Sequence, residues 1–350
     1  MLYEKVLRPG LWSVSANDAE IAHRLTIRSL AALEHVPGAL ELIRSTQKIG
    51  EQEPVTLCGI TFPNRLGLAA GCDKHAEALL ALFALGFGHI EVGTILPRPQ
   101  EGNPRPRLFR LPEDHSVINR MGFNSHGADT VAKRLARYRR LGPMPGPVGL
   151  SLGKMKTTDN AVASVDFIDV LRTLVLYGDY LVGNVSSPNT PELRELQGKA
   201  YLTALVRSIV EADRECRARL KLAPRPLFVK IAPDNMSRFA LEQTLEAIVE
   251  GGGSGVIVCN TTTERPESLV HPLKNEAGGL SGPRLFSTML ALVRKVRELH
   301  PEMPIIAVGG ISSRLDAVKA LRAGADLVQI YTGLVFQGPK LIRDILQTPL

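Results

Sequence analysis

The chain has 350 residues, 44% of them hydrophobic, so it can bury a large core and does not belong to the disordered class. Its 42 Lys and Arg exceed its 35 Asp and Glu, giving a net charge of +7, but the basic residues are scattered. Two local clusters, at 134–140 and 214–221, are typical of solvated helix faces, so we expect no nucleic-acid partner.

Cysteine spacing and hydropathy exclude further classes of protein. Cys58, Cys72, Cys216 and Cys259 show neither zinc-site nor disulfide spacing, so no metal site is expected, and a reducing cytoplasm fits best. No stretch approaches the roughly 18 apolar residues of a spanning helix, and the first residues lack a signal-peptide pattern. We therefore expect a chain that does not cross a membrane, which leaves attachment to its surface open.

Residues 1–45 are predicted to form a small helical extension, separate from a second unit at 46–350. Asn17 and Asp18 can cap a helix that runs to Leu33, and a short helix follows Pro37–Gly38. On a helical wheel, a polar stripe opposes an apolar one, and Ile27 falls on the polar side. The stripes contain Glu20, Arg24 and Arg28 against Ile21, Ala22, Leu25, Ala32 and Leu33. Either a cap packed on the second unit or a pair of interfacial helices fits this pattern.

The second unit contains eight apolar runs bounded by Gly, Pro and Asn, and helix-like segments alternate with them. Eight strands, each followed by a helix, predict a closed (β/α)8 barrel, which places its chemistry at the C-terminal ends of the strands. The predicted strands are 66–70, 89–94, 148–153, 180–186, 227–232, 255–261, 304–309 and 327–332. The Pro-rich stretch 97–124 is too long for a connector and is expected to be an active-site loop.

Polar residues gather at these strand ends. The run 184–190 (NVSSPNT) places amides around Ser187, a hydroxyl that can give or take a proton. Lys230, in an apolar strand, should meet an anionic or carbonyl group, although a structural salt bridge is an alternative. Gly-rich turns after strands six, seven and eight favour a phosphorylated ligand.

Several long motifs in order make the chain resemble the class 2, quinone-dependent dihydroorotate dehydrogenases over nearly its whole length. They are GLAAGCDKHAE (67–77), GFGHIEVGTILPRPQEGNPRPRLFRL (86–111), INRMGFNSHG (118–127), NVSSPNT (184–190), VKIAPD (229–234), GGLSG (278–282) and VQIYTG (328–333). The resemblance implies an FMN flavoenzyme that oxidises (S)-dihydroorotate to orotate in de novo pyrimidine biosynthesis and reduces a membrane quinone.

The same resemblance assigns roles to individual residues. Ser187 is the catalytic base for substrate carbon 5, while hydride leaves carbon 6 for flavin N5. Substrate-binding positions are Lys74, Asn119, Arg120, Met121, Gly122, Phe123, Asn184, Asn189, Asn260 and Thr261, with Lys74 facing the carboxylate. FMN-binding positions are Ala70, Gly71, Thr94, Ser151, Asn184, Lys230, Cys259, Gly282, Gly310, Tyr331 and Thr332. Apart from the resemblance, residues 191–197, which follow Ser187, are the candidate lid over the substrate.

Two positions depart from the family pattern. Ser151 stands where the family usually has Asn, and Cys259 stands where it usually has Thr. A serine hydroxyl reaches less far than a carboxamide, so a direct flavin contact from Ser151 is in doubt and a bridging water could replace it. Cys259 can serve as a packing residue whose backbone carries the contact.

For residues 1–45, the resemblance favours the membrane hypothesis. In class 2 enzymes the N-terminal helices form an apolar tunnel for the quinone, and His23, Arg110 and Tyr331 match positions near it. The implied protein is a monomer bound peripherally to the cytoplasmic side of the inner membrane. Two other hypotheses remain from the residues alone: a non-redox isomerase of a phosphorylated metabolite, and a membrane-bound scaffold that no longer turns over.

Overall fold

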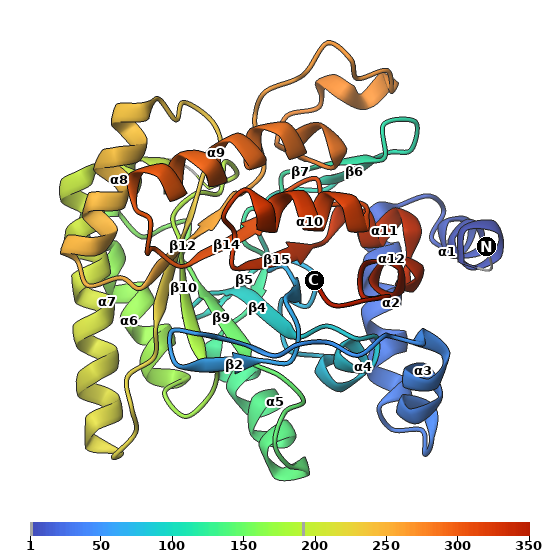
Figure 1. Cartoon of the computed structure of the whole chain (residues 1–350), viewed down its shortest axis with the longest axis horizontal. Coiled ribbons are helices and arrows are strands. Elements are labelled where there is room, and N and C mark those ends of the chain that lie inside the picture. The colour runs from blue at the N-terminus through green and yellow to red at the C-terminus, as the bar shows by residue number, and fades with distance from the viewer. Residues whose placement is uncertain (1–2, 191–192) are drawn as a thin grey trace.

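The computed structural model describes residues 3–190 and 193–350. Its centre is a closed barrel of eight parallel strands in chain order, in which the last strand pairs with the first (Figure 1). The barrel strands are β3 (Leu66–Leu68), β4 (His89–Ile95), β9 (Val148–Leu152), β10 (Tyr180–Asn184), β11 (Leu227–Ile231), β12 (Gly255–Val258), β14 (Ile305–Val308) and β15 (Leu327–Ile330). This confirms the predicted (β/α)8 barrel.

Helices surround the barrel, in agreement with the predicted alternation of strands and helices. They are α4 (Leu79–Ala84), α5 (Ala128–Leu141), α6 (Ala163–Thr173), α7 (Lys199–Arg219), α8 (Arg238–Glu250), α9 (Phe286–Leu299), α10 (Arg314–Arg322), α11 (Thr332–Gln337) and α12 (Pro339–Ile345). Short 3-10 turns lie at η2 (Asn160–Val162), η3 (Leu193–Gln197), η4 (Pro272–Asn275) and η5 (Pro283–Leu285). Helix α4 begins only at Leu79, because the Asp73 carboxylate holds the N–H groups of Glu77 and Ala78 in a preceding loop.

A short antiparallel hairpin, β1 (Val55–Leu57) and β2 (Ile60–Phe62), closes the lower end of the barrel. Phe62 is 1% exposed and packs edge-on against His89, in the cluster that fills the barrel interior with Tyr180 and Phe228. The sequence did not predict this hairpin, because three-residue strands are too short to show an alternating pattern. The sealed lower end leaves the C-terminal end of the barrel for a ligand.

The Pro-rich stretch 97–124, called the excursion below, contains strands of its own. Strand β5 (Pro99–Gln100) pairs with β8 (Ser125–His126), which directly follows the excursion, while β6 (Leu108–Leu111) and β7 (Ser116–Asn119) form a sheet with β13 (Gly279–Ser281). Asn119 stands opposite Gly279 in this register. The stretch expected to be an active-site loop therefore forms a small sheet with the loop after β12.

The N-terminal residues form η1 (Tyr3–Leu7, a π-helix), α1 (Arg8–Val14), α2 (Ala19–Leu33) and α3 (Ala39–Gln47). Asp18 caps α2 as predicted, accepting a hydrogen bond from the N–H of Ile21 at 2.8 Å. The helices lie beside α4, α11 and α12 (Figure 1). Helix α3 continues to Gln47, so the predicted boundary at residue 45 falls within its last turn. No helix among the described residues is long and apolar enough to cross a bilayer.

The predicted faces of α2 were partly wrong. Ile27, placed on the polar side, is 6% exposed, and Glu20, placed in the solvated stripe, is 5% exposed. Ile21 and Leu33, placed on the apolar side, are 41% and 37% exposed. The inward face is set by long-range partners, chiefly an ion pair from Glu20 to Arg107, and a helical wheel contains no information about these.

Candidate active site

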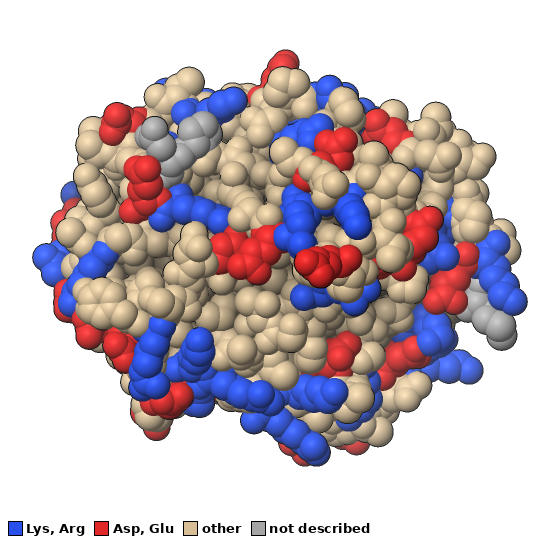
Figure 2. Space-filling view, turned by 90° about the horizontal axis from the view of Figure 1, so that it is seen from above, with Lys and Arg blue, Asp and Glu red and all other residues tan. Residues whose placement is uncertain are grey.

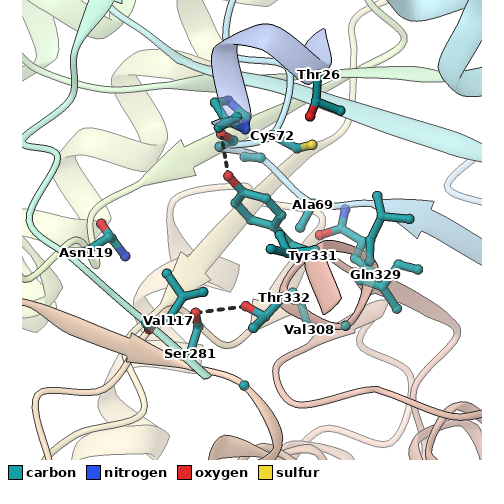
Figure 3. Close-up of a pocket in the computed structure, with 18 of the residues that line it drawn as sticks. Thr26, Ala69, Cys72, Val117, Asn119, Ser281, Val308, Gln329, Tyr331 and Thr332 are labelled. Atoms are coloured by element: carbon teal, nitrogen blue, oxygen red, sulfur yellow. Dashed lines mark hydrogen bonds between the residues drawn. The ribbon is translucent and has the colours of Figure 1, made fainter. Parts of the chain in front are cut away.

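One large cavity, of about 720 Å³, opens at the C-terminal ends of the strands and continues to helices α1 and α2. It brings together most of the predicted site residues. These are His23, Ala70, Gly71, Lys74, Thr94, Arg110, Asn119, Met121, Gly122, Phe123, Asn184, Ser187, Asn189, Lys230, Cys259, Asn260, Thr261, Gly282, Gly310, Tyr331 and Thr332. Figure 3 shows part of its wall, with Tyr331 between Cys72, Ala69 and Gln329.

Arg120 and Ser151, which were also predicted, are not on the cavity wall. The Arg120 guanidinium lies over the Phe109 ring and pairs with Glu276 at 2.6 Å. Ser151 is fully buried behind Thr94, with the two hydroxyl oxygens 3.2 Å apart. Thr94 Oγ1 also accepts a hydrogen bond from Asn184 Nδ2 at 2.7 Å. Ser151 thus reaches the cavity only through Thr94.

The segment after β10 carries Ser187 on the cavity wall. Ser187 is 7% exposed, and its Oγ accepts a hydrogen bond from the N–H of Asn189 at 3.3 Å. This donor favours negative charge on the oxygen, as a base requires.

Residues 191–192 of the predicted lid lie outside the described ranges. The following turn is anchored by Arg194, which donates to Asp234 at 2.8 Å and to the carbonyl of Ser186 at 3.2 Å.

Four asparagines form two hydrogen-bonded pairs of amides beside Ser187. Asn189 Nδ2 donates to Asn119 Oδ1 at 3.1 Å, and Asn260 Nδ2 lies 3.3 Å from Asn184 Oδ1. The Asn260 amide also donates to Ser186 Oγ at 3.0 Å. These contacts fix the orientation of each amide before any ligand arrives. Such amides can donate to and accept from the polar edge of a planar heterocycle.

Two lysines bring positive charge to the cavity without a carboxylate partner in the described part of the chain. Lys74 Nζ donates to the carbonyl of Gly71 at 3.0 Å, and burial lowers the pKa of Lys74 from its ordinary value. Lys230 is 5% exposed and stands beside Asn184 in the barrel register. The predicted alternative, a structural salt bridge for Lys230, is absent among the described residues. Such cations, of which Lys230 is buried and Lys74 partly buried, favour an anionic ligand.

Glycines at the far end of the cavity allow close approach to backbone. Gly310 has φ +72°, and a Cβ there would lie 2.5 Å from the backbone N of Phe286, where α9 begins. Gly282 has φ +124°, and a Cβ there would lie 2.6 Å from Ser116 Oγ. Near them, Thr332 donates to Ser281 at 2.8 Å (Figure 3). An α-helix start next to glycines is suited to a phosphate group.

The opposite end of the cavity reaches the N-terminal helices. Tyr331 donates to the carbonyl of Gly71 at 3.3 Å, and its ring lies 6.4 Å from that of His23. Burial, then the charge of Lys74, lowers the pKa of His23 to about 3, so its ring is neutral. Arg110 lies over the Trp12 ring at 4.2 Å and donates to the carbonyl of Asn17. The wall between them is largely apolar and includes Ala22, Thr26, Ile27 and Leu30.

A histidine cluster beside the cavity does not have the geometry of a metal centre. His75, Glu77 and His126 offer ligand atoms within 4.8 Å of one another. However, the two imidazole rings stack at 3.7 Å and 14°, so their in-plane lone pairs do not converge on one ion. The Arg134 guanidinium, 3.6 Å from Glu77, also repels a cation. We assign no metal to this cluster.

Sequence reasoning gave no role to several residues that support the site. Gln329 lines the cavity and donates to the fully buried Glu91 at 2.9 Å. Asn103 and Arg107 stood inside a quoted motif but received no function. The sequence indicated only that they are polar residues in a Pro-rich stretch. Arg107 bonds Glu20 and Asn103 bonds Asn189, and these partners lie 87 and 86 positions away.

Surface charge gives no further indication of a ligand. On the face shown in Figure 2, acidic residues lie among the basic ones over most of the surface, and a run of basic side chains follows one edge. Some basic residues of the two clusters at 134–140 and 214–221 have partners within the protein. Arg137 forms an ion pair with Glu34, and Arg217 donates hydrogen bonds to backbone carbonyls.

Comparisons with known proteins agree with the geometry. The family model described as dihydroorotate dehydrogenase matches residues 54–348. A dihydroorotate dehydrogenase (quinone) of Chloroflexus aurantiacus is 47% identical, with 99% of this chain and 95% of the relative covered, and one of Salinispora arenicola is 46% identical, with 98% and 97% covered. The crystal structure of Eimeria tenella DHODH in complex with ferulenol superposes with a TM-score of 0.84 at 38% identity, covering 97% of this chain and 92% of that one.

Proposed function

This chain belongs to the dihydroorotate dehydrogenase family, and from that premise we propose how its cavity works. The enzyme oxidises dihydroorotate to orotate in pyrimidine biosynthesis, with a quinone as the final electron acceptor. Family membership sets aside the isomerase and the inactive scaffold. The observation that carries the proposal is a single cavity that joins Ser187 and its amides to an apolar end formed by the N-terminal helices.

The cavity fits a flavin, and we infer that this is FMN. Lys230 supplies a buried cation without a carboxylate partner among the described residues, which suits a ring that gains negative charge on reduction. Gly282, Gly310 and Thr332 would hold the phosphate beside the start of α9, where a side chain in place of Gly310 would collide with backbone. Ala70, Gly71, Thr94, Asn184 and Cys259 would line the ring. When bound, the flavin accepts the hydride that leaves substrate carbon 6.

Ser187 would take the proton from substrate carbon 5. Its Oγ lies on the cavity wall, and the N–H of Asn189 points at it to stabilise the alkoxide that proton transfer requires. A free serine is a weak base, so its action depends on this donor and on the loss of hydride from carbon 6. Proton and hydride together account for the two hydrogens that convert dihydroorotate to orotate.

The amides and Lys74 would orient the substrate. Asn119, Asn189 and Asn260 are held in place by hydrogen bonds, so each presents its remaining donors and acceptors to a ring in the cavity. The Lys74 ammonium has a backbone carbonyl partner and no carboxylate among the described residues, so the substrate carboxylate would complete its coordination. Met121, Gly122 and Phe123 would close over the substrate from the excursion.

The apolar end would admit the quinone, with His23, Arg110 and Tyr331 around it. Val6, Leu7, Val14 and Leu42 on the N-terminal helices are at least 55% exposed, which suits contact with lipid. We infer that residues 1–45 form the unit that attaches a monomeric enzyme peripherally to the cytoplasmic side of the inner membrane. The remainder, from residue 46, would be the catalytic unit.

The proposal is tested by identifying the cofactor and the reductant. Purified protein should be yellow, should release FMN on heat denaturation, and should bleach anaerobically on adding dihydroorotate. A colourless protein that fails to bind added FMN would refute the cofactor assignment. A yellow protein that stays oxidised with dihydroorotate would refute the substrate assignment.

A further inference from the structure

A buried ion pair joins helix α2 to the excursion. Glu20, in the first turn of α2, and Arg107, just before β6, have side chains that are 7% and 6% exposed. Arg107 Nε donates to Glu20 Oε2 at 2.9 Å and Nη2 donates to Oε1 at 2.7 Å, which is a bidentate pair. Arg105 adds a third, more exposed hydrogen bond to the same carboxylate at 3.0 Å.

Arg107 also organises the turn that precedes it. Its Nη1 donates to the carbonyls of Glu101 and Asn103, at 2.6 and 2.7 Å. All three guanidinium nitrogens are therefore engaged, and the charge on Glu20 compensates a cation that would otherwise be buried alone. A change at Glu20 would release the Arg107 side chain and, with it, the turn at 101–103.

Asn103 connects this turn to both substrate segments. Its backbone N–H donates to the carbonyl of Met121 at 3.0 Å, and its Nδ2 donates to the carbonyls of Arg120 and Asn189, at 3.0 and 3.2 Å. A Cβ on Gly122 would come within 2.6 Å of the Asn103 amide, so Asn103 packs directly against the backbone of Gly122. Asn189 in turn holds the amide of Asn119.

We propose that Glu20 and Arg107 are positioning residues for the dihydroorotate site. Helix α2, which lines the quinone end of the cavity, also sets the geometry of the substrate end through Arg107 and Asn103. The inference rests on the proposed function, since it takes Asn119 and Asn189 as substrate-binding residues. It assigns the N-terminal unit a part in the first half-reaction as well as the second.

In the alternative explanation, the ion pair only attaches α2 to the rest of the protein and has no effect on the substrate site. The chain offers a matched control in Glu34, at the other end of the same helix. Its side chain is 2% exposed, pairs with Arg137 at 3.1 Å, and accepts hydrogen bonds from Tyr138 at 2.8 Å and the N–H of Ala81 at 3.1 Å. Neither Glu20 nor Glu34 lines the cavity. Glu34 thus also fastens α2 with a buried carboxylate, but among the described residues its partners make no hydrogen bond to Asn103, Met121 or Asn189.

The experiment compares Glu20→Gln and Glu34→Gln as full-length holoenzymes. For each, orotate is titrated against the oxidised flavin spectrum, flavin reduction by dihydroorotate is followed by stopped flow, and the melting temperature is recorded. Because misplacement by about 1 Å can cost roughly 100-fold in rate, we expect Glu20→Gln to weaken orotate binding and slow flavin reduction by at least about ten-fold. Glu34→Gln should lower the melting temperature and leave both substrate readouts unchanged.

A second variant keeps the test decisive if Glu20→Gln does not fold. Asn103→Ala removes the downstream link without touching α2, so it should reproduce the loss of orotate affinity with normal reoxidation by a quinone analogue. Equal substrate readouts for Glu20→Gln and Glu34→Gln, or an unaffected Asn103→Ala, would overturn the positioning role. Failure of dihydroorotate to reduce wild-type protein would instead overturn the proposed function, so the two failures are distinguishable.

Discussion

Replacing Lys74 by Met tests whether this cation meets the substrate carboxylate. The side chain keeps its length and loses its charge, while the hydrogen bond from Lys74 Nζ to Gly71 is also removed. Truncating one partner of a buried charge pair costs about 2–5 kcal/mol. Lys74 is only partly buried and also has a backbone partner, so the lower end of this range applies, about 2–3 kcal/mol. This corresponds to a rise of roughly 30- to 150-fold in the dissociation constant of orotate.

The assay is titration of the oxidised flavin spectrum with orotate, with Lys319→Met on the exposed side of α10 as the control. Wild type and control should bind alike, and the melting temperature of Lys74→Met should stay near that of wild type. An orotate dissociation constant for Lys74→Met within about three-fold of wild type, less than 1 kcal/mol, would refute the contact between Lys74 and the carboxylate.

Three other changes probe separate parts of the molecule. Ser187→Ala should slow flavin reduction by about 10²- to 10⁴-fold while orotate still binds, because only the base is lost; an unchanged rate in stopped flow would remove Ser187 from that role. Thr26→Trp should obstruct the apolar end and raise the KM for a quinone analogue without slowing flavin reduction by dihydroorotate; equal loss of both would argue against separate ends. Burial lowers the pKa of His89 to about 3 from 6.5, so below pH 6.5 the unfolded chain binds a proton that the folded chain does not. Stability should therefore fall as pH falls, by up to about 1.4 kcal/mol per unit for this residue, and denaturation at pH 7 and 5 should show a smaller loss for His89→Gln.

The sequence predicted the barrel because each strand is an apolar run bounded by breaking residues, and eight of them alternate with helices. It also predicted that polar residues gather at the C-terminal ends of the strands, because a barrel brings these ends together. The same logic explains Lys230 and Asn260, which come from different strands and both line the cavity. Local pattern and topology were sufficient for these elements.

What the sequence did not predict depends on contacts between distant segments. Glu20 looked like a solvated residue, yet it is buried because Arg107, 87 positions away, neutralises it. The partner of Ser151 was not predicted either: its hydroxyl lies 3.2 Å from that of Thr94, on a different strand. Helix α1 and the hairpin β1–β2 are too short for periodicity to reveal. Such features become visible only when the partner is known.

The central claim is that one cavity couples dihydroorotate oxidation to quinone reduction. The most direct measurement is an anaerobic titration of the holoenzyme, first with dihydroorotate and then with a short-chain quinone. We expect one equivalent of dihydroorotate to bleach the flavin and yield orotate, and one equivalent of quinone to restore the oxidised spectrum. A flavin that bleaches but is not reoxidised by the quinone, or that is not bleached at all, would contradict the account.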